Sequence, residues 1–186
     1  MISVLMSTYK EPLPWIQAAV DSILTQTFRD IELVVVVDNP ENTQLIELLE
    51  AYRAEKSNIK VVLNEQNIGL VKSLNKGLAY CTGEYIARMD ADDISDPRRL
   101  ERQLQEMKRY DYDLMGCQVE KFWEEDSCGI EEIPFSHEAC CKVLRYMCCV
   151  SHPSWLVKRS VFEQLNGYRD MDACEDYDFL LRAALK

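Results

Sequence analysis

Two groups of carboxylates are the residues of this chain best suited to chemistry. The first is Asp90-Ala91-Asp92, which follows a short apolar run at residues 83–87 that is typical of a buried strand. Two aspartates separated by one residue, at the carboxyl end of a strand, place hard oxygen ligands where a divalent cation can bridge to a diphosphate. The second is Glu175-Asp176, which offers a separate carboxylate to take a proton from an attacking hydroxyl. The pattern indicates a metal–diphosphate site with a remote general base.

The elements that must position these residues alternate between strand and helix. Valines at 34–37 form an apolar run that ends at Asp38 and is typical of a parallel strand buried on both faces. Apolar residues at helical spacing after Pro14 predict an amphipathic helix. Along this half of the chain we expect strands at 2–6, 33–37, 61–63 and 83–88, and helices at 15–24, 41–52, 70–79 and 97–109.

This alternation predicts an α/β fold. Strands and helices in this order form right-handed βαβ units and a Rossmann-like, mostly parallel central sheet with helices on both faces. Ligands of such folds bind at the carboxyl ends of the strands. Three polar groups follow predicted strands, namely Ser7-Thr8-Tyr9, Asp38 and Asp90-Ala91-Asp92. We therefore expect them to converge at one edge of the sheet.

The second half of the chain has a less regular pattern. We expect strands at 114–117 and 155–157 and helices at 137–146 and 176–185, with a hairpin or exposed loop in the acidic segment 122–132. Trp15 and Trp155 are expected to be core residues. Because the chain ends within the last predicted helix, we expect the domain to be truncated at its C-terminus.

Length and composition limit the class of protein. The chain has 186 residues, 47% of them hydrophobic and 28% charged, which predicts one globular domain. The net charge of −11 disfavours nucleic acid or an anionic membrane surface as a partner. No apolar stretch reaches the roughly 20 residues that span a bilayer, and the first residues lack the features of a signal peptide. We therefore expect a cytoplasmic protein whose eight cysteines, with no C-x-x-C among them, are buried reduced thiols.

Short motifs along nearly the whole chain, from about Ser3 to Asp178, resemble those of family 2 glycosyltransferases with the GT-A fold. One such motif is weak evidence, whereas the set in this order is specific. The resemblance implies a single GT-A domain over 1–186, with a nucleotide-sugar-binding half at 1–96 and an acceptor-side half at 97–186. The matching segments are residues 4–9, 22–27, 31–32, 67–69, 75–77, 82–86, 90–93, 152–154, 167–168 and 175–177.

The resemblance also implies an activity, which is transfer of a sugar with inversion from a nucleotide-diphosphate sugar to an acceptor hydroxyl. A UDP-sugar is the favoured donor, and the acceptor would be a carbohydrate or lipid-linked sugar in polysaccharide or surface glycan biosynthesis. Asp92 and Asp90 would hold a divalent cation, Mn²⁺ or Mg²⁺, which stabilises the diphosphate as leaving group. Asp176 is the implied base, and Glu175 would orient the acceptor or share that role. Peripheral membrane association through a region beyond residue 186 is a further expectation.

Individual binding roles follow from the same resemblance. Asp38 corresponds to a base-reading aspartate whose carboxylate accepts from N3–H of a uracil-like ring, although a preceding aspartate of the family is Val37 here, which leaves the base open. Glu11 would hold the ribose. The implied nucleotide-binding set is Ser7, Thr8, Tyr9, Glu11, Asp38, Lys72, Arg88, Asp90 and Ala91, and the implied acceptor-side residues are His152 and Trp123.

Structural explanations remain open for several of these residues. Asp38 begins a turn sequence, and an acidic pair also suits the first turn of a helix. An EF-hand in residues 90–101 is excluded, because Ile94 and Ser95 stand where a ligand and a glycine are required. The remaining alternatives are solvated or paired cations for Lys72 and Arg88, a core aromatic for Tyr9, a structural imidazole for His152 and a helix N-cap for Asp96.

Two other functions compete with sugar transfer. A sugar nucleotidyltransferase on a related fold opens with a glycine-rich phosphate loop after the first strand, and residues 7–12 contain no glycine. A non-catalytic module that binds a nucleotide or partner would not need Asp90, Asp92 and Asp176. The sequence therefore favours the transferase.

Overall fold

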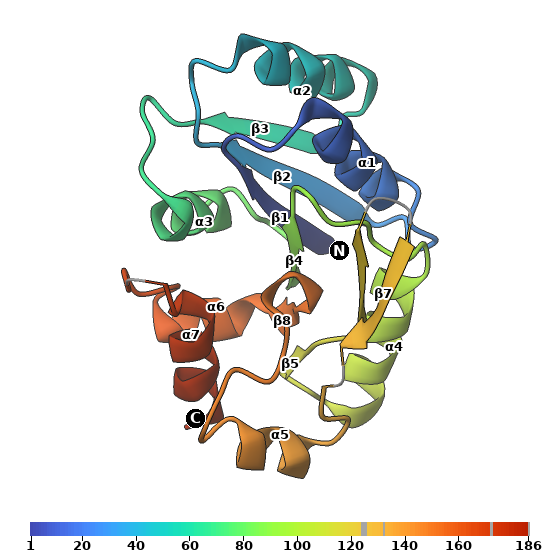
Figure 1. Ribbon diagram of the computed structural model, residues 1–186, viewed down its shortest axis with the longest axis vertical. Helices are drawn as coiled ribbons and strands as arrows, with labels where there is room; N and C mark the ends of the chain where they lie inside the picture. The colour runs from blue at the N-terminus through green and yellow to red at the C-terminus, as the bar shows by residue number, and fades with distance from the viewer. Residues whose placement is uncertain (124–125, 132, 172, 186) are drawn as a thin grey trace.

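A six-stranded sheet forms the centre of the molecule, in the order β3-β2-β1-β4-β8-β5 (Figure 1). The computed structural model describes residues 1–123, 126–131, 133–171 and 173–185. The first four strands along the chain are parallel, and β8 runs antiparallel to both β4 and β5. The predicted mostly parallel sheet is confirmed. The strands are β1 (Ile2–Thr8), β2 (Ile31–Val37), β3 (Ile59–Leu63), β4 (Tyr85–Asp90), β5 (Leu114–Met115) and β8 (Leu156–Lys158).

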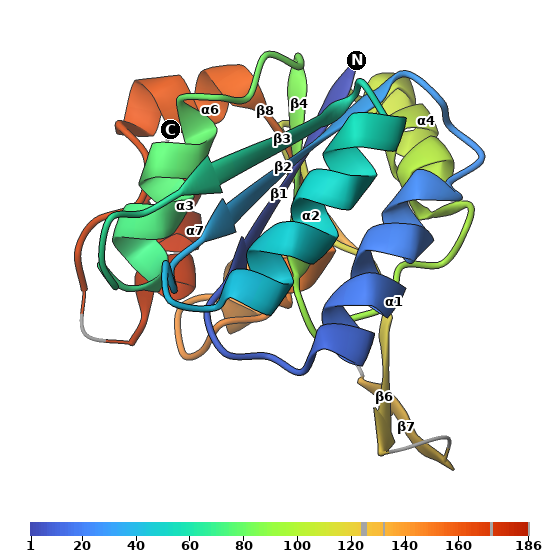
Figure 2. The ribbon, with the colours of Figure 1, turned by 90° about the horizontal axis from the view of Figure 1, so that it is seen from above.

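Helices cover both faces of this sheet, as predicted. Figure 2 shows α1, α2 and α4 on one side and α3, α6 and α7 on the other. The short helix α6 and a 3-10 turn before β8 were not predicted. The helices are α1 (Leu13–Leu24), α2 (Thr43–Glu55), α3 (Leu70–Leu78), α4 (Arg99–Tyr110), α5 (His137–Val143), α6 (Arg159–Leu165), α7 (Glu175–Ala184) and the 3-10 turn η1 (His152–Ser154).

The core is divided into two layers by β2. Leu33, Val35 and Val37 pack toward α1, α2 and α4, whereas Val34 and Val36 pack toward α3, α6 and α7. All five side chains are fully buried. Successive side chains of a strand point to opposite faces, so a continuous apolar run is what a sheet covered on both sides requires. The interpretation of the valine run is therefore confirmed.

The acidic segment forms a two-stranded hairpin, made of β6 (Val119–Trp123) and β7 (Asp126–Glu131), that projects from the sheet (Figure 2). The part of the expected 122–132 segment at 124–125 and 132 lies outside the described residues, as does the side chain of Trp123. The described side chains of β7 are mostly exposed. No described helix has the length and the apolar character that crossing a membrane requires.

Two expectations about buried residues need correction. Trp155 is fully buried as predicted, but Trp15 is 56% exposed. The buried face of α1 contains Ile16 and Val20, and Trp15 lies one residue, or about 100° of helical rotation, away from that face. All eight cysteines are free, but only Cys81 and Cys149 are buried; Cys128 and Cys174 are exposed, and the other four are partly buried.

Candidate active site

The polar groups that follow β1, β2 and β4 lie at one edge of the sheet. The strand register places Ser7 beside Asp90 of β4 and Thr8 beside Val37 of β2. The Asp38 amide then donates to the Thr8 carbonyl at 2.8 Å. Because the strands are parallel, their carboxyl ends meet at the same edge. The predicted convergence of these three segments is confirmed.

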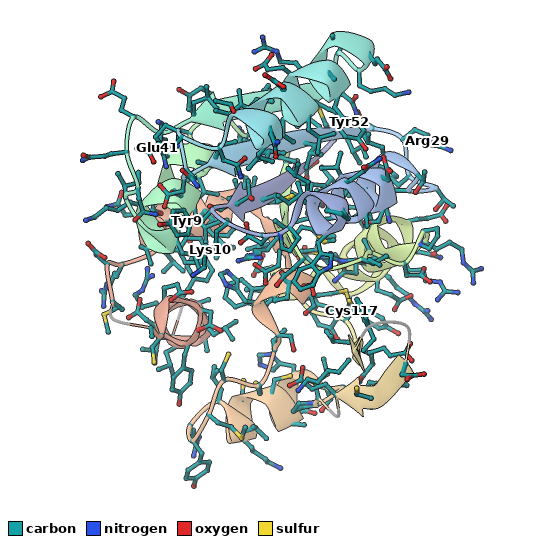
Figure 3. The ribbon with its side chains drawn as sticks, turned by 45° about the horizontal axis from the view of Figure 1, so that its top comes forward. Tyr9, Lys10, Arg29, Glu41, Tyr52 and Cys117 are labelled. Atoms are coloured by element: carbon teal, nitrogen blue, oxygen red, sulfur yellow. The ribbon has the colours of Figure 1, made fainter. Side chains whose placement is uncertain are left out.

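Glu11 closes the loop that follows β1. Its Oε2 accepts hydrogen bonds from the Thr8 hydroxyl at 2.7 Å and from the Tyr9 amide at 2.8 Å. Tyr9 is 41% exposed and is therefore not a core aromatic. Lys10 Nζ lies 5.9 Å from the Tyr9 ring centroid, and Figure 3 shows both side chains at this loop. The loop thus presents an aromatic face and a cation to solvent.

Asp38 is buried and accepts four hydrogen bonds from the chain itself. Oδ1 accepts from Asn64 Nδ2 at 2.7 Å and from the Ile68 amide at 2.8 Å. Oδ2 accepts from Asn67 Nδ2 at 3.0 Å and from the Gly69 amide at 2.9 Å. A carboxylate offers about four lone-pair positions, and these four donors occupy them. The Asp38 carboxylate therefore holds the loop before α3, and its role in reading the base stays a prediction.

Arg88 presents an unsatisfied donor beside this edge. Its side chain is 3% exposed, and its Nη1 donates to Asp90 Oδ1. The Nε–H has no hydrogen-bond partner among the described residues. A buried donor without a partner costs roughly 1–3 kcal/mol, and an anionic ligand would remove that cost. Of the two cations predicted to contact phosphate, Arg88 is the one with an unpartnered buried donor among the described residues.

Lys72 is placed differently. Its Nζ lies 3.4 Å from Asp170 Oδ2, and both side chains are mostly exposed. Lys72 does not line the cleft described below, although Asp170 does. The solvated, paired alternative for Lys72 therefore fits its position.

Three aspartates, Asp90, Asp92 and Asp93, lie at the carboxyl end of β4. Burial raises the pKa of Asp93 to about 6, and the carboxylates of Asp90 and Asp92 contribute. Partial burial also raises the pKa of Asp92, with Asp90 again adding to the effect. Like charges that disfavour one another's ionised form are compatible with a bound cation.

The fit of a divalent cation at this position can be tested on the residues present. Among the described residues, no group of three or more His, Cys, Asp or Glu side chains is arranged to enclose a metal ion. Mg²⁺ is commonly bound by only one or two carboxylates, with substrate phosphates and waters as the other ligands. Asp90 and Asp92 fit that kind of site, in which the substrate supplies the remaining oxygens.

The acidic pair Glu175-Asp176 begins α7 and lines a cleft of about 650 Å³. The cleft is lined from β4 by Arg88 and Asp90 and from α7 by both carboxylates. His152 of η1 and Asp170 also line it. Five residues predicted from separate motifs are therefore brought into one cavity, whereas Asp92 lies outside its lining.

Asp176 is held by two contacts. Its Oδ1 accepts from the Tyr177 amide at 2.7 Å, and its Oδ2 accepts from the Cys148 thiol at 3.5 Å. Burial raises the pKa of Cys148 to about 12, and the charge of Asp176 contributes, so the thiol remains a donor. Cys148 was not predicted as a site residue, because nothing in the sequence places it near Asp176.

Gly69 is a second feature of the cleft that received no role from the sequence. It precedes α3 with φ of 84° and lines the cleft. The amide groups at the N-terminus of a helix attract anions. The motif at residues 67–69 was the available signal, since it was among the segments that resemble the family.

Comparison with known proteins supports the family resemblance. Residues 3–165 match the family described as Glycosyl transferase family 2. An uncharacterized glycosyltransferase of Methanocaldococcus jannaschii is 33% identical over 186 residues, which cover 98% of this chain and 64% of that protein. The O-antigen biosynthesis glycosyltransferase WbnJ of Escherichia coli is 32% identical, over 98% of this chain and 71% of that protein.

Solved structures agree with the GT-A fold. The S. aureus TarS fragment 1-349 in complex with UDP superimposes with a TM-score of 0.79 at 21% identity, over 99% of this chain and 55% of that one. The mannosyltransferase PcManGT from Pyrobaculum calidifontis, in complex with GDP-Man and Mn²⁺, gives a TM-score of 0.75 at 19% identity, over 98% and 51%. This chain thus spans between about half and seven tenths of the length of these proteins. The match over residues 3–165, together with both relatives, establishes that the chain belongs to glycosyl transferase family 2.

Proposed function

We propose that this chain binds a nucleotide-diphosphate sugar and transfers its sugar, with inversion, to an acceptor hydroxyl. The observation that carries the proposal is the cleft, which is lined by Arg88 and Asp90 of β4 and by the two carboxylates Glu175 and Asp176 of α7. A donor diphosphate and an acceptor hydroxyl need opposite chemical partners, and the cleft presents both kinds of group.

The β4 wall is the proposed donor side. The Nε–H of Arg88, which has no partner among the described residues, would donate to a phosphate oxygen. The first turn of α3, whose Leu70 and Val71 line the cleft, would face the same anion. Asp90 and Asp92 are the residues that would hold a divalent cation. When bound, such a cation stabilises the diphosphate as a leaving group. The exposed Tyr9 ring is available to pack against the nucleoside.

The α7 wall is the proposed acceptor side. Asp176 would accept the proton of the attacking hydroxyl, because it lines the same cleft as Arg88 and Asp90. Glu175, beside it, would orient the acceptor. A single displacement at the anomeric carbon inverts its configuration.

The proposed partners follow the comparisons. The TarS complex contains UDP and the PcManGT complex contains GDP-Man, so both nucleotides are donors to test, with a UDP-sugar first. The proposed acceptor is a carbohydrate or lipid-linked sugar, because WbnJ is named for O-antigen biosynthesis and another relative for amylovoran biosynthesis. We place this reaction in the cytoplasm, where nucleotide sugars would be the donors.

Calorimetric titration of UDP into the protein, with and without Mn²⁺, tests the donor site. We expect binding that requires Mn²⁺ and that disappears in Asp92→Ala, with an unchanged melting temperature as the control for folding. The same titration with GDP follows. Failure of both nucleotides to bind in the presence of metal would contradict the proposal.

A further inference from the structure

A buried tyrosine–histidine pair lies directly behind the Glu175 carboxylate. We propose that Tyr168 is a positioning residue, which fixes the tautomer of His152 so that the imidazole Nδ1–H points at Glu175. The role of Glu175 toward an acceptor rests on the function proposed above, whereas the tautomer does not depend on it. The two can therefore be tested separately.

His152 lies between Tyr168 and Glu175, with one ring nitrogen close to each. His152 Nε2 lies 2.8 Å from the Tyr168 hydroxyl. The other ring nitrogen, Nδ1, lies 3.9 Å from Glu175 Oε1. His152 is 8% exposed and Tyr168 is 3% exposed. At 3.9 Å the second contact is longer than a hydrogen bond, so it is an electrostatic contact between the ring and the carboxylate.

The His152 imidazole is neutral near pH 7. Burial lowers the pKa of His152 well below its usual value, and the nearby Arg88 guanidinium lowers it further. Burial likewise raises the pKa of Tyr168 well above its usual value, so its hydroxyl keeps its proton. The contact with Glu175 is therefore not a salt bridge. Whether this contact is attractive or repulsive depends on which ring nitrogen carries the single imidazole proton.

Only one position of that proton gives the imidazole favourable contacts with both the Tyr168 hydroxyl and the Glu175 carboxylate. If Nε2 carried the proton, the Tyr168 hydroxyl could accept from it, but the lone pair of Nδ1 would face the Glu175 carboxylate. If Nδ1 carries the proton, Nε2 accepts from the Tyr168 hydroxyl and the N–H dipole is directed at the carboxylate. With the proton on Nε2, the buried Tyr168 O–H would also have no acceptor among the described residues, whereas with the proton on Nδ1 it donates to Nε2. The Tyr168 hydroxyl therefore favours the second arrangement.

Tyr168 is itself fixed in place from the other half of the chain. Asn75 of α3 holds both of its backbone groups: Nδ2 donates to the Tyr168 carbonyl at 2.8 Å, and Oδ1 accepts from the Tyr168 amide at 2.9 Å. The preceding Gly167 has φ of 70°, and a Cβ at that position would lie 2.4 Å from Asn75 Oδ1. The ring packs against Phe162 and Phe179. The hydroxyl therefore has a defined position.

The consequence concerns acceptor binding. An imidazole N–H directed at Glu175 favours one orientation of that carboxylate in the cleft, next to Asp176. A misplacement of about 1 Å in a reacting group can lower a rate roughly a hundredfold. Tyr168 would thus influence the acceptor without touching it, through His152 and then Glu175.

Nitrogen-15 NMR of the imidazoles tests the tautomer directly. The chain has only two histidines, so His137→Gln assigns the remaining imidazole to His152. We expect His152 to be neutral and protonated at Nδ1 in the wild type. In Tyr168→Phe, which keeps the packed ring and removes the hydroxyl, we expect a substantial population protonated at Nε2. A wild-type His152 protonated at Nε2 or at both nitrogens would overturn the proposal, as would an unchanged tautomer in Tyr168→Phe.

Tyr177→Phe is the matched control. The Tyr177 hydroxyl donates to the Leu144 carbonyl at 2.8 Å, so this variant loses a tyrosine hydrogen bond of the same length without touching His152. Its His152 tautomer should match the wild type. If Tyr177→Phe shifts the tautomer as much as Tyr168→Phe does, a general loosening is responsible and the proposal is wrong.

A kinetic measurement joins the tautomer to function. In Tyr168→Phe we expect kcat/KM for the acceptor to fall about tenfold, while the Kd of the donor nucleotide stays within twofold. A shifted tautomer with unchanged acceptor kinetics would overturn the role of Tyr168 in acceptor positioning. Absence of turnover in the wild type itself would contradict the proposed function and leave the tautomer result standing.

Discussion

The amide of Gly69 donates a hydrogen bond of 2.9 Å to Oδ2 of Asp38, and this contact joins the end of β2 to the start of α3. The adjacent Ile68 amide donates to the other carboxylate oxygen at 2.8 Å. Two backbone donors of one loop are thus satisfied by a single buried side chain. The position of the α3 N-terminus at the cleft therefore depends on Asp38.

Replacement of Asp38 by Asn should be strongly destabilising. The amide NH₂ cannot accept, so at least one partly buried backbone N–H loses its partner, at about 1–3 kcal/mol. We expect urea unfolding to show a loss of about 2–3 kcal/mol. Asp21→Asn is the control, because its carboxylate accepts one exposed hydrogen bond from Tyr52 and should change stability by less than about 1 kcal/mol. Equal losses in both variants would contradict the role given to Asp38.

Arg88→Met should separate ligand binding from folding. The substitution removes a buried guanidinium whose Nε has no partner among the described residues. It also leaves Asp90 without its ion-pair partner, but the Asp90 side chain is 36% exposed, so water can solvate that carboxylate and limit the loss of stability. We expect UDP affinity in the presence of Mn²⁺ to fall at least about tenfold, since a charge-assisted hydrogen bond is lost. The melting temperature should change little. Unchanged affinity would show that Arg88 does not contact the phosphates.

Asp176→Asn should strongly slow sugar transfer without weakening binding of the donor nucleotide. A general base contributes about 10²–10⁴-fold to a rate, and the substitution removes the base without changing the β4 wall. We expect kcat to fall by that factor, with a Kd for UDP equal to that of the wild type. Glu175→Gln is the comparison, and its smaller effect should appear in KM for the acceptor. Full transfer activity in Asp176→Asn would show that the base lies elsewhere.

Acid stability should depend on Glu32. Burial alone would raise the pKa of Glu32, but the ion pair with Lys60 and hydrogen bonds from Ser3 and Thr82 outweigh it and lower the pKa to about 2. A carboxyl whose pKa is lower in the folded state stabilises the protein above its unfolded value of 4.5. That contribution is lost as the pH falls toward 2.

Glu32→Gln measures this contribution. The difference in the free energy of unfolding between wild type and variant should be largest at pH 7 and should shrink by about 2 kcal/mol at pH 3. Urea denaturation at the two pH values gives both numbers. A difference that stays constant with pH would show that the ionisation of Glu32 does not stabilise the fold.

Gly167→Ala should disturb the contact between the two halves of the chain. A positive φ costs an alanine about 1–2 kcal/mol, and the added Cβ would also meet Asn75 Oδ1 at 2.4 Å. We expect a total loss of about 2–4 kcal/mol. Gly129→Ala is the matched control, since Gly129 has φ of 102° and no described atom lies within 4 Å of the point that an added Cβ would occupy. If both variants lose the same stability, the approach of Asn75 contributes nothing.

Much of the fold and the location of the site could be predicted from the sequence. The valine run of β2 and the alternation of strands with helices are local patterns, and parallel strands must bring their carboxyl ends to one edge. The convergence of Ser7, Asp38 and Asp90 follows from that rule. The amphipathic stripe of α1 correctly predicted the helix but wrongly placed Trp15 in the core. A residue at the border of such a stripe can face either the core or the solvent, and the helical spacing alone does not decide which.

Only the tertiary structure determines which polar atoms already have hydrogen-bond partners in the chain and which remain available to a ligand. Asp38 looks like a ligand residue in the sequence, yet donors from residues 64–69 occupy both of its oxygens. Arg88 looks like an ordinary cation, yet burial leaves its Nε without a partner among the described residues. The line from Tyr168 through His152 to Glu175 joins segments that no local pattern relates. Hydrogen-bond saturation and burial are properties of the packed chain, because they depend on neighbours that only folding brings together.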